Sequence, residues 1–416
     1  MSEEYFLDDL GVANFDRVAN IIVRPTKVGT LFGDPSTDTW DKDKNHFSVI
    51  KDGATYKLWY TGVDGSATVR PCYATSSDGL SFDKPTLSLI SYGGNTNNNI
   101  LLATDNLFVA VNYKNGRTPA YLGISNFKAG ATNHGVYLYN SSDGTSWANN
   151  YKEIYSGALD GNYKEGKFLF ERDDGRYLAF YAHGHANQRR QIGAYLSATS
   201  DLTGTWADQG VLIDSRSQEK QYYYVCVKKV GSSYIALVGR YQKTPETITT
   251  ELWHSRDLVT WIQLDAEWVA LGAATAWDDA MILGGLDLVE VGNVWRHYYT
   301  GHEENHATAG GSRAARIGYA TLGRGRLVEI NGTGSVTTVP VTVAEGENLK
   351  INADCTGGSI DVEVIGVASF TAADCDTIIT DSFYDTITWG AAGIPAGQYQ
   401  LRFDLSTAKL YGYSIS

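Results

Sequence analysis

Sulfur-containing residues are scarce in this chain, which has four cysteines and two methionines among its 416 residues. The cysteines form no Cys-x-x-Cys pair and have no histidine at zinc-binding spacing. Cys355 and Cys375 share one C-terminal segment and could pair, but reduced core thiols are the more frequent outcome at such a low cysteine density. The sequence therefore offers no thiol-based metal site.

Long apolar runs and an excess of positive charge are also missing. No run approaches the roughly 18 apolar residues of a membrane span, and the first residues, MSEEYFLDDLGVANF, have neither the basic nor the apolar region of a signal peptide. We expect a protein without a membrane span, in the cytoplasm or on a virion unless another route exports it. Lysine and arginine number 34 against 47 acidic residues, a formal net charge of −13, which argues against a nucleic-acid partner.

Nucleotide-binding fingerprints and segments with a helical period are absent as well, so we expect no cofactor. The chain is rich instead in glycine (44), tyrosine (27) and tryptophan (10). This composition is typical of aromatic strands joined by many turns, and it predicts a mostly β fold.

One turn phrase occurs four times. In each copy an Asp can fold its carboxylate onto nearby backbone N–H groups, and an aromatic residue then starts a strand. These aspartates are 65, 58 and 56 residues apart, a little longer than the four-stranded blades of known propeller repeats. The copies read SSDGLSF at Ser76–Phe82, SSDGTSW at Ser141–Trp147, TSDLTGTW at Thr199–Trp206 and HSRDLVTW at His254–Trp261.

An aromatic strand phrase such as YKLWYTG at Tyr56–Gly62 precedes each turn, and a fifth copy, WRHYYTG, stands at Trp295–Gly301. Five units of antiparallel strands from about Trp40 to Ile330 predict a five-bladed β-propeller. The turn aspartates should then occupy equivalent turns on successive blades: Asp78, Asp143, Asp201 and Asp257.

The strand pattern changes near residue 330, where the blade phrases stop and apolar and polar residues begin to alternate, as in strands with one buried face. We predict an all-β chain of two domains: a five-bladed β-propeller over residues 1–330 and an antiparallel β-sandwich over residues 331–416. Within residues 1–39, the strand-like VANIIVRPTK either closes the ring against the last blade or forms a free arm.

The order YKLWYTG…YATSSDG, FERDDGRYLAFY…LSATSD and WDDAMILGG…HYYTG…RIGYATL resembles the five-bladed propeller glycoside hydrolases of families 32 and 43. The C-terminal segment is similar to the β-sandwich that follows the propeller in the family 32-like group. The chain lacks the WMNDPNG-like, RDP and EC motifs of family 32, so neither fructan nor arabinan follows as the substrate. The ERDDG at Glu171–Gly175 has no proline after its Arg-Asp pair and predicts a hairpin turn.

Residues just before the innermost strand of each blade converge on one mouth of the propeller channel. We expect these strands to begin near Asp41–Phe47, Asn97–Ile100, Glu165–Phe168, Glu219–Tyr222 and Asp278–Ile282. Four of the five starts carry a carboxylate. Glycoside hydrolysis needs two: a proton donor, and a second group that acts as nucleophile or base.

Each of the four carboxylates has a predicted role. Asp41 is the closest match in position to the first-blade Asp that the resembled families use as nucleophile or base. Glu165 or Glu219 is the predicted proton donor, because a Glu among aromatics can hold a raised pKa. Asp278 is predicted to orient or tune its neighbours, and the alternative for each residue is a turn cap.

Flat aromatic faces near these carboxylates can stack on a sugar ring, although packing inside the blades is the alternative. An arginine there can reach an anionic substituent. The GHEENH segment lacks the helical spacing of a zinc motif, so we expect no metal. The predicted substrate-binding residues are Trp40, His46, Asn99, Arg189, Tyr222, Trp277 and His302.

We therefore expect a glycoside hydrolase that cleaves an oligo- or polysaccharide with paired carboxylates at the channel mouth. The main alternative is a non-catalytic carbohydrate-binding protein on the same scaffold. A third possibility, which concerns location more than chemistry, is a virion protein, either a receptor binder or a depolymerase. The sequence leaves the sugar, the linkage, the stereochemistry and the oligomeric state open.

Overall fold

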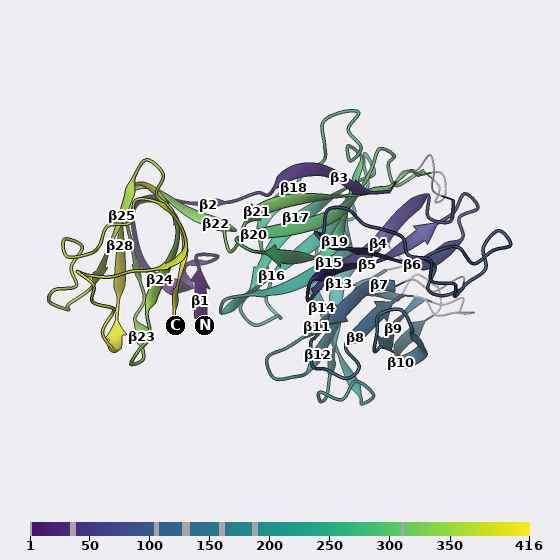
Figure 1. Cartoon of the computed structure of the whole chain (residues 1–416), viewed down its shortest axis with the longest axis horizontal. Helices are drawn as coiled ribbons and strands as arrows, with labels where there is room; N and C mark the ends of the chain where they lie inside the picture. Colours follow the sequence, from purple (N-terminus) through teal and green to yellow (C-terminus); the bar gives the residue numbers. More distant parts are fainter. Residues whose placement is uncertain are drawn as a thin grey trace.

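The computed structural model describes residues 2–33, 39–103, 108–126, 134–157, 163–184, 190–308 and 313–416. Over these residues the chain is all-β, as predicted: it forms 28 strands and one short 3-10 helix, Asp9–Gly11. Among the described residues no helix has the length and apolarity needed to cross a membrane. The two ends of the chain lie close together, between the two parts of the molecule (Figure 1).

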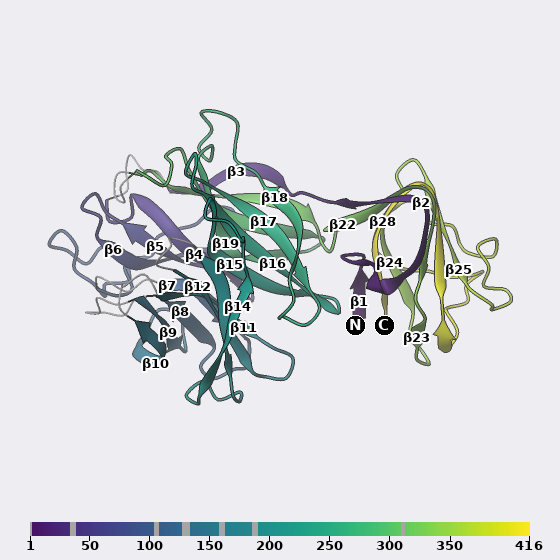
Figure 2. The ribbon, with the colours of Figure 1, turned by 180° about the vertical axis from the view of Figure 1, so that it is seen from behind.

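Five groups of antiparallel strands follow one another along the chain, and neighbours in sequence are neighbours in each group. The first three groups are separate sheets, whereas the fourth and fifth are joined by one parallel pair, Ile248 with Met281. The fifth group is completed by β3 (Thr26–Phe32), an N-terminal strand that pairs antiparallel with β21. Figures 1 and 2 show the five groups together as the larger part of the molecule.

The strands of these groups have the following bounds. The first group is β4 (Asp43–Asp52), β5 (Thr55–Val63) and β6 (Val69–Ser76), and the second is β7 (Phe108–Tyr113), β8 (Tyr121–Ser125), β9 (His134–Ser141) and β10 (Ala148–Gly157). The third is β11 (Lys164–Glu171), β12 (Tyr177–His183), β13 (Gln191–Ser197) and β14 (Trp206–Ile213). The fourth is β15 (Lys220–Val230), β16 (Ser233–Gln242), β17 (Thr247–Ser255) and β18 (Ile262–Val269), and the fifth is β19 (Met281–Val291), β20 (Val294–His302) and β21 (Arg316–Gly323) with β3.

The C-terminal strands belong to a separate seven-stranded sheet. Its centre is the long strand β28 (Leu401–Ile415), which pairs with four other strands. Cys355 and Cys375 are buried free thiols in this part. Its other C-terminal strands are β22 (Val328–Thr338), β24 (Leu349–Asp354), β25 (Ser359–Val364) and β26 (Asp381–Thr386), and β23 (Val341–Val343) pairs with β27 (Gly397–Tyr399) beside it.

The N-terminal residues contribute to both parts of the molecule. Strand β1 (Ser2–Tyr5) pairs with β28, and β2 (Val12–Ile22) pairs with β22. The sequence-based alternatives were a closing strand or a free arm; β3 takes the place of a closing strand, whereas β1 and β2 join the C-terminal sheet. The partner of an edge strand is set by tertiary pairing, which a short alternating segment does not reveal.

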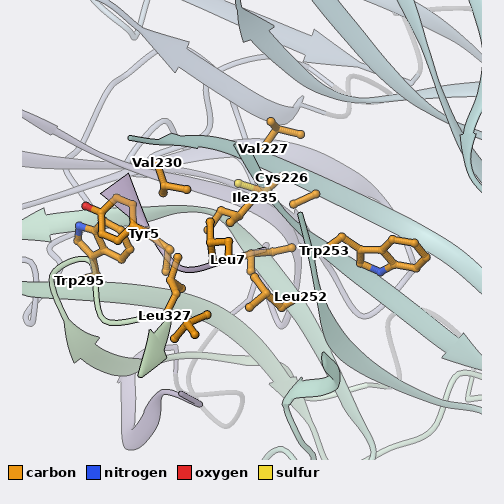
Figure 3. Packing of buried hydrophobic residues seen from close by; sticks show 14 of the residues in the cluster. Tyr5, Leu7, Cys226, Val227, Val230, Ile235, Leu252, Trp253, Trp295 and Leu327 are labelled. Carbon is orange, nitrogen blue, oxygen red and sulfur yellow. The ribbon is translucent and has the colours of Figure 1, made fainter. Parts of the chain in front are cut away.

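Side chains of the first residues fill a hydrophobic core between the two parts. Tyr5 lies near Trp295, and Leu7 points among Ile235, Leu252 and other side chains of the fourth group (Figure 3). The two guanidinium nitrogens Nε and Nη2 of Arg256 donate to the Asp8 carboxylate at 2.7 and 2.6 Å. The N-terminal segment therefore holds the C-terminal sheet against the strand groups.

The repeated turn phrase has the same structure in three of its four copies, as predicted. One oxygen of Asp78 accepts hydrogen bonds from the N–H groups two and three residues later, and Asp143 and Asp257 do the same. Asp201, in the third copy, instead accepts from the N–H and the hydroxyl of Thr203. Each turn follows the third strand of its group.

Two further expectations concern loops. The ERDDG segment is a hairpin turn between β11 and β12, closed by a backbone hydrogen bond from Arg172 to Arg176 of 2.8 Å. The expected inner-strand start at Asn97–Ile100 is wrong: the first strand of the second group is β7, and Ile100 instead forms an isolated bridge with Cys72 of β6. A polar run before an apolar residue, as in NNNI, does not by itself mark the start of an inner strand.

Candidate active site

The first strand of every group has a β-bulge or register break near its start. It falls at Asn45/Phe47 in β4, Gly166/Phe168 in β11 and Tyr222/Tyr224 in β15, and β7 and β19 have one as well. A bulge redirects the side chain of its extra residue. The extra residues in β4, β11 and β15 are His46, Lys167 and Tyr223, and all three line one pocket.

This pocket has a volume of about 350 Å³. It opens at the end of the groups where the first strands begin, so residues far apart in sequence meet there. Of the residues predicted for a site at this end, Glu165 and His46 line the pocket. The lining residues are Asn45, His46, Thr61, Val63, Ala67, Val69, Asn126, His134, Glu165, Lys167, Arg190, Tyr223, Ile248, Leu283, His306 and Arg313.

Glu165 is the one carboxylate that the described residues contribute to the lining. Its two oxygens contact Nδ1 of His134 at 3.1 Å and Nζ of Lys167 at 2.7 Å. Burial raises the pKa of Glu165, but the charge of Lys167, the hydrogen bond with His134 and nearby Arg190 outweigh it and hold the pKa well below its usual range. The predicted raised pKa of Glu165 is therefore wrong, and the group is an ionised carboxylate fixed in place from both sides.

An aromatic wall adjoins Glu165. The guanidinium carbon of Arg190 lies 4.2 Å from the ring centre of Tyr223, and Nη2 of Arg190 donates to the Tyr163 hydroxyl at 2.9 Å. His306 packs against the Tyr223 and Tyr241 rings, with ring centres 5.0 and 4.8 Å apart. Burial lowers the pKa of His306 to about 4, so this imidazole is neutral at neutral pH.

Asp43, the first residue of β4, adjoins the pocket through two lining residues. Its Oδ2 accepts a hydrogen bond from Asn45 Nδ2 at 3.0 Å and lies 3.5 Å from Nε of Arg313. Its Oδ1 is buried and has no hydrogen-bond partner among the described residues. Burial raises the pKa of Asp43 against the opposing effect of Arg313. A carboxyl group in these surroundings is held closer to its protonated form than Glu165 is.

Asp41, the predicted nucleophile or base, lies outside the pocket lining and is fully buried. Its Oδ2 accepts a hydrogen bond from the Tyr60 hydroxyl at 2.5 Å and contacts Nζ of Lys84 at 2.8 Å. Predicted sugar-binding residues complete this network, because Trp40 donates to Asn99 and Asn99 donates to Tyr60, each at 2.8 Å. These contacts hold the start of the first group together.

Asp278 repeats the same arrangement in the fifth group. Its Oδ2 accepts from the Tyr299 hydroxyl at 2.9 Å and contacts Nζ of Lys27 at 2.7 Å. The Trp277 ring stacks on Tyr299, with ring centres 5.2 Å apart and planes 17° apart. Because the Trp-Asp pair and its Tyr and Lys partners occur at equivalent places in two groups, they fit a structural role better than a catalytic one.

The remaining predicted residues lie elsewhere. Glu219 is exposed in the turn before β15, and Tyr222 is buried with its ring edge against Trp253. His302 is fully buried, outside the pocket lining. Arg189 lies outside the described residues, next to Arg190, which does line the pocket. The described residues contain no cluster of three His, Cys, Asp or Glu side chains suited to a metal ion.

The lining residues that the sequence reading missed share a signal. Lys167 lies within the predicted strand start Glu165–Phe168, and Tyr223 directly follows the predicted start Glu219–Tyr222. In a regular strand, the side chains of Lys167 and Tyr223 would point away from the mouth of the channel. The bulge turns them toward it. The bulge itself leaves no clear mark in one sequence, so neither side chain was among the predicted site residues.

The fold is similar to that of solved glycoside hydrolases. An α-L-arabinofuranosidase from Podospora anserina, solved with cellotriose, aligns with a TM-score of 0.54 at 13% identity, over 72% of this chain and 97% of that one. The catalytic domain of a family 62 α-L-arabinofuranosidase from Coprinopsis cinerea gives 0.53 at 13% identity, with the same coverage of each chain. No protein-family model matches the sequence, and no curated protein matches it.

These likenesses show the fold: the chain has the architecture of the β-propeller glycoside hydrolases, as the resemblance in its blade phrases implied. At such low identity they carry neither substrate nor mechanism over to this chain. The function of the chain depends on the chemistry and geometry of the pocket residues.

Proposed function

We propose that the protein is a glycoside hydrolase whose substrate, an oligo- or polysaccharide, binds in the pocket at the bulged starts of the first strands. In this proposal the five strand groups are the blades of a five-bladed propeller, and the seven-stranded sheet with its small companion is a C-terminal β-sandwich. The observation that carries it is an ionised carboxylate, Glu165, fixed beside an aromatic wall in a pocket of a fold used by glycoside hydrolases.

Glu165 is the proposed nucleophile or base. Its charge persists at low pH because Lys167 and His134 bind it, and an ionised carboxylate is what either role requires. Tyr223 is the proposed aromatic contact for a sugar ring, since it lines the pocket beside Arg190.

Asp43 is the proposed proton donor. It contacts the lining side chains Asn45 and Arg313, and burial favours its protonated form, which a general acid needs before it can protonate a leaving group. In this assignment Asp41 and Asp278 support the fold and take no part in bond cleavage.

The test is hydrolysis of a broad panel of aryl glycosides and polysaccharides by the wild type and by Glu165→Gln. We expect turnover of any cleaved substrate to fall by about 10³-fold or more in Glu165→Gln. The matched control, Glu219→Gln, changes an exposed Glu outside the pocket and should leave turnover unchanged. Full activity in Glu165→Gln with loss in Glu219→Gln would contradict the proposal.

A second variant tests the proposed proton donor, Asp43. Asp43→Asn should slow substrates with a sugar leaving group strongly and activated phenyl glycosides little, because a good leaving group departs without a proton. Equal slowing of both kinds of substrate would show that Asp43 is not the proton donor.

A non-catalytic carbohydrate-binding protein is the second candidate. It is favoured by the single carboxylate that the described residues place on the pocket lining, since hydrolysis needs two. Binding of a glycan that Tyr223→Ala abolishes, without hydrolysis of any member of the panel, would support this candidate over the first.

A further inference from the structure

The described side chains that line the pocket carry an excess of positive charge, although the chain as a whole carries a net charge of −13. Among them are three lysine or arginine side chains, Lys167, Arg190 and Arg313, against one carboxylate, Glu165. Neighbouring His46 and His306 have pKa values lowered by burial to about 3 and about 4, so they add no positive charge at neutral pH. A local excess of cations on an acidic protein attracts an anionic ligand to this place.

The three cations are not equivalent. Lys167 is bound to Glu165 at 2.7 Å, so its charge is matched within the protein. Arg190 donates to the neutral hydroxyl of Tyr163 and lies over the Tyr223 ring. The charge of Glu165 also acts on Arg190, but the Glu165 oxygens contact Lys167 and His134 directly. The direct contacts of the Arg190 guanidinium are with the neutral side chains of Tyr163 and Tyr223.

Arg313 is also left without a strong anionic partner in the described part of the chain. Its Nε is buried, makes no hydrogen bond there, and approaches Oδ2 of Asp43 only to 3.5 Å. Burial favours the neutral form of Asp43, which weakens this pair further. A buried guanidinium N–H without a partner costs free energy unless a ligand supplies the acceptor.

A second polar atom points to a ligand with hydroxyl groups. Asn126 is 4% exposed and lines the pocket, and its Oδ1 has no hydrogen-bond partner among the described residues. An amide oxygen accepts hydrogen bonds, so it calls for a donor such as a sugar hydroxyl. The pocket thus combines an acceptor for hydroxyls, an aromatic face and two arginines for an anion.

We propose that the sugar bound in this pocket carries a carboxylate, as in a uronic acid, and that Arg190 and Arg313 bind it. This inference rests on the proposed function, because it concerns the ligand of the same site. A planar carboxylate matches the fork of a guanidinium, which can donate two parallel hydrogen bonds to it. A sulfate ester shares the negative charge, and the experiment separates the two.

Binding of free monosaccharides to the full chain tests the inference by calorimetric titration. The probes are matched pairs of a uronic acid and its parent hexose in the gluco, galacto and manno configurations, with the corresponding hexose 6-sulfates as a third arm. We expect one uronic acid to bind at least about tenfold more tightly than both its parent hexose and its 6-sulfate, a difference of about 1.4 kcal/mol.

Two variants assign the preference to the arginines. Arg313→Gln should reduce the preference for the uronic acid to less than about threefold, and Arg190→Lys, which keeps the charge but loses the planar fork, should weaken it. The control is Arg172→Gln in the β11–β12 hairpin, which should bind as the wild type does. A preference that survives in Arg313→Gln and Arg190→Lys, with both variants folded, would overturn the inference.

The remaining outcomes are also decisive. Equal or tighter binding of a parent hexose would overturn the inference and leave the proposed function standing. Tighter binding of the 6-sulfate than of the uronic acid would contradict a carboxylate ligand and indicate a sulfate ester instead. Absence of binding and of hydrolysis for every sugar would overturn the proposed function, and the inference with it.

Discussion

The two ends of the strand groups are built on different principles. In each group the third strand runs parallel to the first, so the turn after the third strand lies at the opposite end from the pocket. At the turn end, residue identities repeat, and one oxygen of Asp78 and of Asp143 accepts hydrogen bonds from two backbone N–H groups. At the pocket end the bulge repeats, but the residues on it are His46, Lys167 and Tyr223.

This difference distinguishes residues that stabilise the fold from residues that form the candidate site. Some residues repeat at equivalent places, such as the Asp of the turns and the Trp-Asp pairs before β4 and β19. Such a residue stabilises a turn or a strand start that several groups share. A geometry that repeats with a different residue each time presents chemically different side chains to one pocket. Two buried polar atoms without a hydrogen-bond partner among the described residues belong to this pocket, Oδ1 of Asn126 and Nε of Arg313.

The largest effect on stability is expected from breaking the repeated Trp-Asp network. Asp41→Asn and Asp278→Asn each leave a lysine, Lys84 or Lys27, without its carboxylate. We expect each to lower the free energy of unfolding by about 3 kcal/mol, the low end for breaking a buried ion pair, because both lysines are partly exposed. Urea denaturation measures this change.

Turnover per folded molecule should be nearly unchanged in both of these variants. A wild-type unfolding midpoint together with lost turnover in Asp41→Asn would return this residue to the catalytic role that the sequence indicated.

At the pocket end, Lys167→Met should change the pH dependence of activity. Lys167 helps to keep the pKa of Glu165 low, so its removal should raise that pKa and move the acidic limb of the pH–activity profile upward by about 1–3 pH units. Lys164→Met is the control, because Lys164 lies in the same strand but contacts Asp208 outside the pocket. An unmoved acidic limb in Lys167→Met would separate Glu165 from catalysis.

Buried histidines at the pocket end should make stability depend on pH. Burial lowers the pKa of His302 to about 3, against about 6.5 in the unfolded chain. Because the unfolded state then binds the extra proton, stability falls as the pH drops below about 6.5 and stops falling near pH 3. Between pH 8 and pH 5 this residue alone should cost about 2 kcal/mol, and His302→Gln should remove that part of the difference.

The smallest effect is expected at a single turn. Asp143→Ala removes the acceptor of two backbone hydrogen bonds, from Thr145 and Ser146, and should lower the free energy of unfolding by about 1–2 kcal/mol without affecting binding. Ser142→Ala, at an exposed neighbour, is the control. A larger loss in the control than in Asp143→Ala would contradict the role of the turn.

The same contrast explains how much the sequence could predict. Repeated phrases gave the all-β class, the strand groups and the turns, because they reflect local hydrogen bonding that each copy repeats. Glu165 and His46, predicted by their position at the starts of inner strands, line the pocket. Lys167, Tyr223 and Asp43 were missed, because a bulge and long-range burial decide where their side chains point and how they ionise. The pairing of β1 and β2 with the C-terminal sheet depends equally on contacts far apart in the sequence.

The central claim is that the sugar binds where the bulged first strands meet. A crystal structure of Glu165→Gln soaked with an oligosaccharide that the wild type cleaves or binds tests it most directly. The account predicts a sugar ring against Tyr223, with an anionic group between Arg190 and Arg313. A sugar bound instead in the cavity near the other ends of the first strands, lined by Val49, Phe168 and Leu288, would contradict it.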